Sequence, residues 1–178
     1  MSKLEEILKK AAGIKVEQVN SYNLSAVMSL LSMKSFGCTD LKFYELEFVA
    51  DAKKQNMEVV GLEKIESQLS IIENAYTVDE MLKMLEELSV AKTAELVDAY
   101  KNENLNLLYL DITDEKLMNK KTKAELLDKR NIDWISKVPA LMKKESIFMA
   151  VGAAHLVGEH GVLNLLKKAG YTVRPILK

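Results

Sequence analysis

The sequence predicts an α/β domain that is rich in helix, with a small, mostly parallel sheet and a C-terminal βαβ unit. Composition indicates the helices, because a chain of 178 residues rich in Leu, Lys, Glu and Met has only two prolines and seven glycines. Short apolar runs at residues 57–63, 146–151 and 171–176 indicate the strands. A helical pattern between the last two runs completes the βαβ unit, whose two strands pair in parallel.

Capping signals and helical spacing place three helices in the first third of the chain. Ser2 and Glu5 form a capping box, and Gly13 suits the left-handed end of that helix. Apolar residues recur at helical spacing over residues 23–33, before the turn around Gly37. Residues 43–52 predict the third helix, which Lys and Gln residues separate from the first strand.

The middle and the end of the chain predict further helices around the sheet. Thr77 and Glu80 form a second capping box, and the apolar pattern after it predicts one helix of about 20 residues. Residues 105–142 also predict helix, with a restart at Thr122 and a kink or boundary at Pro139. Residues 157–169 are amphipathic and end at Gly170. No repeat or linker divides the chain, so residues 1–178 read as a single domain.

Charge and composition exclude several classes of protein. The 25 Lys and Arg residues nearly balance the 26 Asp and Glu residues, so no overall field attracts nucleic acid or anionic lipid. No apolar run approaches the roughly 20 residues of a membrane span, so the chain reads as soluble. The single cysteine, Cys38, has neither a disulfide partner nor the spacing of a metal or thiol site. Localisation stays open.

Two polar side chains follow predicted strands at equivalent positions. Glu63 comes after the first strand, in Gly61-Leu-Glu, and His155 comes after the second, in Gly152-Ala-Ala-His. Because ligands gather at the carboxyl ends of parallel strands, we expect the carboxylate and the imidazole to share one rim of the sheet. The small residues from Gly152 onward leave room beside the imidazole ring.

Each of these residues also has a purely structural interpretation. A histidine after a buried strand often serves as a hydrogen-bonded structural residue, and Glu63 could simply cap the helix that follows it. Glu159 lies four residues after His155 and could orient its ring, or it could be a solvated charge at a helix start. His160 is expected at the surface, because its spacing from His155 differs from that of a helical zinc motif.

The C-terminal run from Phe148 to Val173 resembles the closing signature of the TraB/GumN family, which includes PrgY and Tiki proteins. Upstream, Gly61-Leu-Glu63 with Gln68 resembles the Gly-Leu-Glu element of the family, and Arg130-Asn131 with Trp134 resembles its Arg-Asn-x-x-Trp segment. The resemblance begins near residue 15 and is strongest over the last 35 residues.

The resemblance implies a metal-dependent hydrolase of the peptidase type in the intact protein. It implies that His155 binds a divalent metal and that Glu63 binds the metal or acts as a base, supported by Gly152, Gln68, Arg130 and Glu159. The family's site has two Gly-x-x-His motifs, and only Gly152-x-x-His155 is present here. We therefore expect a fragment that lacks the family's first strands and is inactive alone. An envelope or exported location is plausible for the full-length parent.

Two other functions remain open at this point. A module that binds a peptide without cleaving it fits the same rim, and a purely structural role of Glu63 and His155 would leave no active site. Because missing strands would expose a sheet edge, we also expect the chain to associate with itself as a homo-oligomer.

Overall fold

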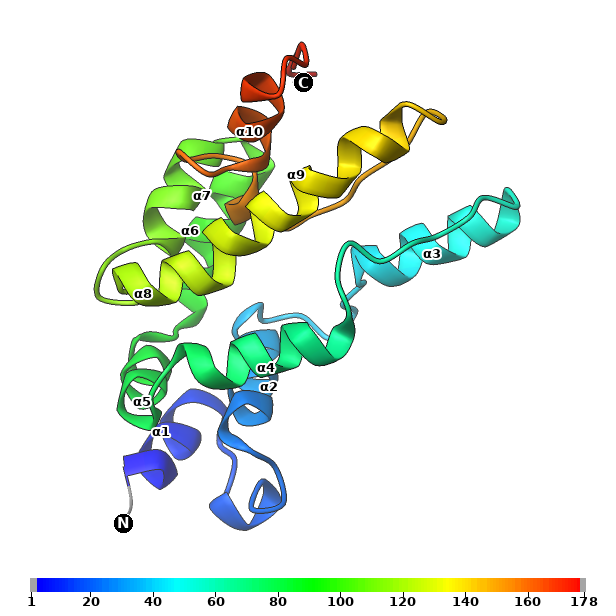
Figure 1. The fold of residues 1–178 in the computed structure, drawn as a ribbon. Helices are drawn as coiled ribbons and strands as arrows, with labels where there is room; N and C mark the ends of the chain where they lie inside the picture. Colours follow the sequence, from blue (N-terminus) through cyan, green and yellow to red (C-terminus); the bar gives the residue numbers. More distant parts are fainter. Residues whose placement is uncertain (1–2, 177–178) are drawn as a thin grey trace.

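Helices make up the regular secondary structure of residues 3–176, the part of the chain that this computed structural model describes (Figure 1). The α-helices are α1 (Lys3–Ala12), α2 (Leu24–Ser35), α3 (Tyr44–Lys54), α4 (Ile65–Ala75), α5 (Val78–Glu87), α6 (Val90–Lys101), α7 (Leu105–Ile112), α8 (Lys120–Lys123), α9 (Lys129–Met142) and α10 (Val162–Lys168). Short 3-10 turns occur at Val16–Gln18 and Ala153–His155, and Ala124–Asp128 form a π-helical turn.

The helices of the first third begin and end where the local chemistry predicts. Asn23 caps α2 by accepting a hydrogen bond from the backbone of Ala26 at 2.9 Å. Gly13 follows α1 with a φ of +63°, the left-handed conformation expected at a helix end. Ser2, the expected start of the first capping box, lies outside the described residues. The capping box of Thr77 and Glu80 is confirmed at the start of α5.

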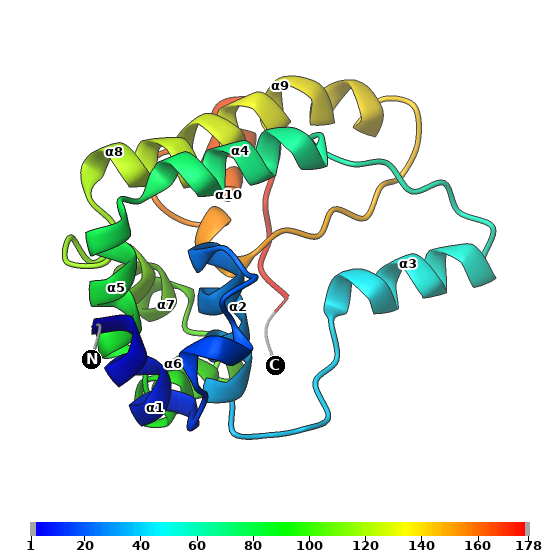
Figure 2. The same ribbon diagram turned by 90° about the horizontal axis from the view of Figure 1, so that it is seen from below.

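The predicted sheet is wrong, because residues 3–176 contain no strand. The runs at 57–63, 146–151 and 171–176 are irregular segments, so neither the parallel pairing nor the βαβ unit exists in this structure. An apolar, β-branched run favours extended backbone, but a strand also requires a neighbouring chain segment for its hydrogen bonds. These three runs find no such neighbour. Figures 1 and 2 show the segments before α4 and after α9 as open loops.

The predicted long helix after Thr77 is also divided. The chain breaks at Leu88, and Ser89 caps a separate helix, α6, by accepting a hydrogen bond from the backbone of Lys92. The expected restart near Thr122 lies inside α8, which Asn119 caps. Pro139 lies within α9 and does not end it, and the C-terminal helix is shorter than predicted.

The buried apolar side chains form two separate clusters. The N-terminal cluster joins α1, α2 and α5 and consists of Ile7, Leu8, Val19, Val27, Leu31 and Leu85. The C-terminal cluster joins α9 and α10 and consists of Trp134, Ile135, Val138 and Val162, with Leu62, Met149, Val151, Leu165 and Leu166 packed against it. Leu62, Met149 and Val151 belong to segments predicted as strands, so these residues are near a core although they form no sheet.

The π-helical turn Ala124–Asp128 joins α8 to α9 in one continuous rod that begins the C-terminal half. Its i→i+5 bonding accommodates one extra residue in the turn. Thr122, near its start, donates a hydrogen bond from its hydroxyl to the carbonyl of Ala75 at the end of α4, at 2.8 Å. This contact ties the rod to α4, which leads back to Glu63.

Helix α3 stands apart from the other helices. None of its residues is buried, and Figure 2 shows it joined to the remainder by long connections at both ends. Across residues 3–176, no helix is both long enough and apolar enough to cross a membrane. The expected self-association stays a prediction, but the sheet edge that would explain it is absent from this part of the chain.

Candidate functional site

Arg130 brings the two site residues expected from the sequence together. It lies in the first turn of α9, directly after the π-helical turn, and its guanidinium reaches both Glu63 and His155. Its Nε donates to the two carboxylate oxygens of Glu63 at 3.2 and 3.1 Å, and its Nη2 donates to Oε1 at 2.5 Å. Its Nη1 lies 3.5 Å from Nε2 of His155.

The ion pair between Glu63 and Arg130 is largely withdrawn from water. The side chains retain 16% and 12% of their exposure, whereas the surface pair of Lys54 and Asp51 retains 75% and 60%. Gln68 in the first turn of α4 donates a further hydrogen bond to Oε1 of Glu63 at 3.1 Å. Glu63 therefore does not cap α4, whose N-cap residue is Lys64.

His155 lies at the end of the 3-10 turn Ala153–His155 and is buried. Its Nδ1 lies 2.6 Å from Oδ1 of Asn131, the neighbour of Arg130 on α9. Its ring packs against Trp134, with 4.6 Å between the ring centroids. Burial lowers the pKa of His155 to about 4, and the positive charge of Arg130 adds to this lowering, whereas Glu63 opposes it. The imidazole is therefore neutral at pH 7.

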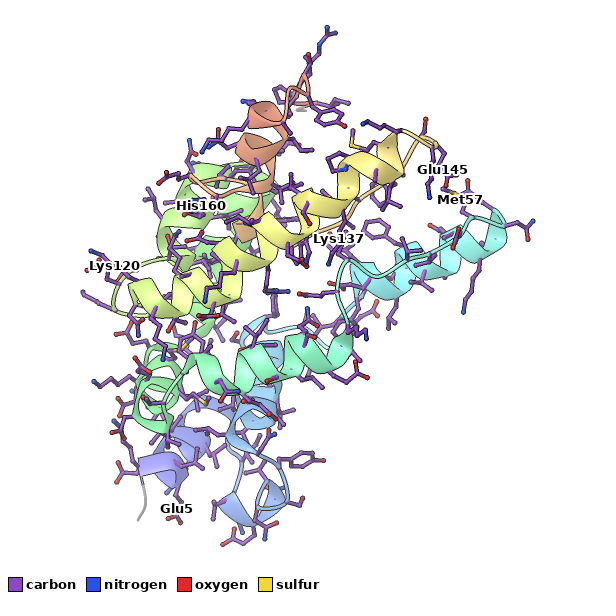
Figure 3. All side chains as sticks on the ribbon, viewed as in Figure 1. Glu5, Met57, Lys120, Lys137, Glu145 and His160 are labelled. Carbon is purple, nitrogen blue, oxygen red and sulfur yellow. The ribbon has the colours of Figure 1, made fainter. Side chains whose placement is uncertain are left out.

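The remaining residues expected near the site contribute less. A Cβ added at Gly152 would lie 3.7 Å from Cδ2 of His155, an ordinary contact, so space does not require glycine there. Glu159 is exposed, and its carbonyl accepts a hydrogen bond from Asn164 at 2.8 Å, while Asn131 contacts the ring that Glu159 was expected to orient. His160 is partly exposed, with Nδ1 3.7 Å from Asp128 (Figure 3).

Sequence reasoning missed Asn131 and Trp134 as parts of this site. Asn131 is 1% exposed and occupies the same buried face of the rod as Leu127, Trp134 and Val138. A polar amide at a core-facing position of an amphipathic helix is the signal that could have identified it. Trp134 contacts both His155 and Arg130, whose guanidinium lies 5.1 Å from the ring centroid.

The residues present do not fit a hydrolytic metal as they stand. A catalytic zinc ion takes about three protein ligands, and residues 3–176 contain no group of three His, Cys, Asp or Glu side chains that could hold a metal. Glu63 and His155 supply two donors. Both of them contact the guanidinium of Arg130, a cation that would repel a metal ion.

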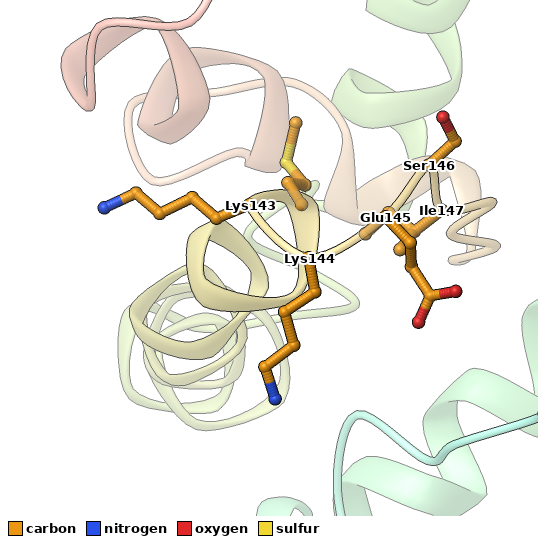
Figure 4. Close-up of a pocket in the computed structure, with 6 residues that line it drawn as sticks. Lys143, Lys144, Glu145, Ser146 and Ile147 are labelled. Atoms are coloured by element: carbon orange, nitrogen blue, oxygen red, sulfur yellow. The ribbon is translucent and has the colours of Figure 1, made fainter.

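Two surface hollows lie away from this group. One of about 550 Å³ is lined by six consecutive residues, from Met142 to Ile147, at the end of α9 (Figure 4). It is the concave side of one turn, whereas binding sites form where several elements converge. A second, of about 260 Å³, lies among residues of α5, α6 and α7 and the loop after α7.

Comparison with known proteins identifies the family. Residues 1–175 match the TraB/PrgY/gumN family. A segment of 54 residues is 41% identical to "Metalloprotease TIKI2" of Danio rerio, and it covers 29% of this chain and 10% of that protein. No solved structure matches the chain. The match over nearly the whole sequence shows that this chain belongs to the TraB/PrgY/gumN family.

Proposed function

We propose that this chain contributes Glu63 and His155 to the active site of a metal-dependent peptide hydrolase and is inactive alone. The name of the Danio rerio relative supports the type of activity, although the match covers a tenth of that protein. The observation that carries the proposal is the convergence of Glu63 and His155 on Arg130. Further metal ligands would come from additional polypeptide, because residues 3–176 provide no group of three.

In this proposal, the chain's own residues have separate roles. His155 presents Nε2, the ring nitrogen on the side of Glu63 and Arg130, while Nδ1 is occupied by Asn131. Glu63 provides the carboxylate, and Arg130 compensates its negative charge. Trp134 shields one side of the imidazole from water. When bound, the metal would supply an activated water for attack on an amide.

Cobalt binding tests this proposal, because Arg130 competes with a metal ion for the same two donors. We expect weak binding of Co²⁺ to the chain and an increase of more than about tenfold in the Arg130→Gln variant, where the competing charge is removed. Titration calorimetry measures the affinity, and circular dichroism checks that the variant is folded. Adding Glu63→Gln or His155→Gln to Arg130→Gln should abolish binding.

The control for this experiment is His160→Gln, which changes the other histidine of the chain and should leave cobalt affinity unchanged. A folded Arg130→Gln variant that binds no cobalt would contradict the proposal. In a protein that combines this chain with the additional polypeptide, metal-dependent peptide cleavage that survives His155→Ala would contradict it as well.

The competing function is binding of a peptide without cleavage, and Arg130 is the observation that favours it. Its guanidinium already satisfies Glu63, as a permanent structural ion pair would. If binding alone is the function, peptide affinity should be unchanged by a chelator and by Glu63→Gln. Metal-dependent product formation by this chain together with the additional polypeptide would decide for hydrolysis.

A further inference from the structure

The amide of Asn131 meets three polar groups in a buried position. Its Nδ2 donates to the carbonyl of His160 at 2.9 Å and to that of His155 at 3.3 Å. Its Oδ1 lies 2.6 Å from Nδ1 of His155. Turning the amide around would place its oxygen against two carbonyl oxygens, which can only accept hydrogen bonds. The two carbonyl contacts therefore fix Oδ1 toward the imidazole.

An amide oxygen accepts a hydrogen bond and cannot donate one, so Nδ1 of His155 must carry the proton. The other ring nitrogen gives the same answer independently. Nε2 faces Nη1 of Arg130 at 3.5 Å, and a guanidinium has donors but no acceptor. A proton on Nε2 would point at a cation, whereas a lone pair there is attracted to it.

We propose that Asn131 is a positioning residue that holds His155 as the Nδ1–H tautomer, with the lone pair of Nε2 directed toward Arg130 and Glu63. A neutral histidine binds metal or accepts a proton only through its unprotonated nitrogen. Contacts at the second ring nitrogen commonly set this choice in metal sites. The consequence for activity rests on the proposed function, but the tautomer is a property of the chain without metal or substrate.

Nitrogen NMR of ¹⁵N-histidine-labelled protein at pH 8.5 measures the tautomer directly. The chain has two histidines, so the His160→Gln background leaves the signals of His155 alone. We expect Nδ1 to give the protonated signal and Nε2 the unprotonated one. A wild-type His155 with its proton on Nε2 would overturn the proposal, whatever the variants show.

Substitutions of Asn131 then separate positioning from packing. Asn131→Leu keeps similar volume but removes the acceptor, so the Nε2–H fraction should rise measurably, to an extent limited by Arg130, which still faces Nε2. Asn131→Asp keeps an acceptor beside Nδ1 and should keep the Nδ1–H form, although its second oxygen would face the carbonyl oxygens of His155 and His160 and lower stability. Asn164→Leu is the matched control, because it removes an amide that contacts only the backbone of Glu159 among the bonds described. An Asn131→Asp chain that is folded yet carries the Nε2–H form would overturn the role.

This experiment and the cobalt titration can fail separately. If the folded Arg130→Gln variant binds no cobalt while His155 keeps its Nδ1–H tautomer, the proposed hydrolase function is rejected and the role of Asn131 stands. Binding of cobalt by a chain whose His155 carries its proton on Nε2 in the free state would reject the role of Asn131 alone.

Discussion

Glu63 and Arg130 form an ion pair whose side chains are mostly shielded from water but remain fully hydrogen-bonded. The carboxylate accepts from Arg130 and Gln68, and the Nη1 of Arg130 also donates to the carbonyl of Leu126 at 2.8 Å. Removing one partner of such a pair leaves an uncompensated charge, while replacing both partners by apolar residues removes the desolvation cost as well. Removing one partner should therefore lower the free energy of unfolding strongly, whereas replacing both partners by apolar residues should change it little.

We expect Arg130→Met to lower the free energy of unfolding by about 3–5 kcal/mol, because Glu63 is left without its counter-charge. The double variant Glu63→Met, Arg130→Met should recover most of that loss. Urea unfolding followed by circular dichroism measures all three chains. Lys54→Met is the control, since its pair with Asp51 is exposed to water and its loss should change stability far less. A double variant as unstable as Arg130→Met would contradict this prediction.

His155 makes stability depend on pH in a defined direction. Its pKa is lowered from 6.5 to about 4 in the folded chain, so the unfolded chain binds the proton first as pH falls. The contribution of neutral His155 to stability is therefore fully present above about pH 7. It is lost as the pH falls from 6.5 to about 4. Between pH 7.5 and 5 the loss amounts to about 2 kcal/mol.

Urea unfolding at pH 7.5 and at pH 5 tests this dependence. The difference between the two pH values should shrink in His155→Gln, which cannot take up the proton, and should persist in His160→Gln. Equal pH dependence in the wild type and in His155→Gln would show that another group is responsible.

Among the elements, the loop from Leu156 to Gly161 holds His155 in place through two close approaches. An added Cβ at Gly158, which has a φ of +96°, would lie 2.4 Å from Oη of Tyr109 on α7. An added Cβ at Gly161 would lie 2.3 Å from the carbonyl oxygen of Val157. The first approach holds the loop against α7 and the second closes the loop on itself, and the loop carries the backbone carbonyl of His160 that Asn131 contacts.

Gly158→Ala should be more destabilising than Gly170→Ala, although the two glycines have similar φ values of +96° and +90°. Both substitutions incur backbone strain of about 1–2 kcal/mol, but only the first also displaces the Tyr109 ring, for about 1–3 kcal/mol more. Thermal unfolding of the two variants gives the comparison. Equal losses would mean that the ring moves aside without cost.

Helices with capping residues could be predicted from the sequence, whereas the supposed strands could not. Asn23, Thr77 and Gly13 act within a few residues of themselves, so their effect is encoded locally. The run Met57–Gly61 has the composition of a strand but lacks a partner segment, and no local pattern reveals that lack. Glu63 and Arg130 are 67 positions apart in the sequence, so the spacing of residues could not predict their contact. The family resemblance named both residues but not the contact between them.

At the scale of the whole molecule, the candidate site lies beside one of the two clusters of buried apolar side chains. The C-terminal cluster supports Trp134 and hence the ring of His155, while the N-terminal cluster lies around α1, α2 and α5. A buried hydrogen bond of 2.7 Å, from Thr93 on α6 to Ser35 on α2, joins α6 to the helices of the N-terminal cluster. Helix α3 contributes no buried residue to either cluster.

We expect α3 to open with a smaller free energy than the clustered helices. Its backbone amides should exchange with deuterium faster than those of α2 and α9, because few buried contacts oppose its opening. Leu46→Ala in α3 should change stability by less than about 0.5 kcal/mol, since Leu46 is 67% exposed. Leu31→Ala in α2 is the matched substitution and should cost about 2–5 kcal/mol, because Leu31 is 2% exposed. Equal exchange rates in α2 and α3 would contradict this assignment.

The π-helical turn before α9 changes the direction in which the side chains of α9 point around the axis of the rod. Along the rod, successive buried positions are at most four residues apart, except for the step of five from Thr122 to Leu127 across this turn. Deleting one residue inside Ala124–Asp128 would restore a uniform helical count and rotate α9 by about 100° relative to α8. Arg130 and Asn131 would then leave Glu63 and His155 while the helix itself stayed intact, so these contacts depend on a single additional residue in the turn.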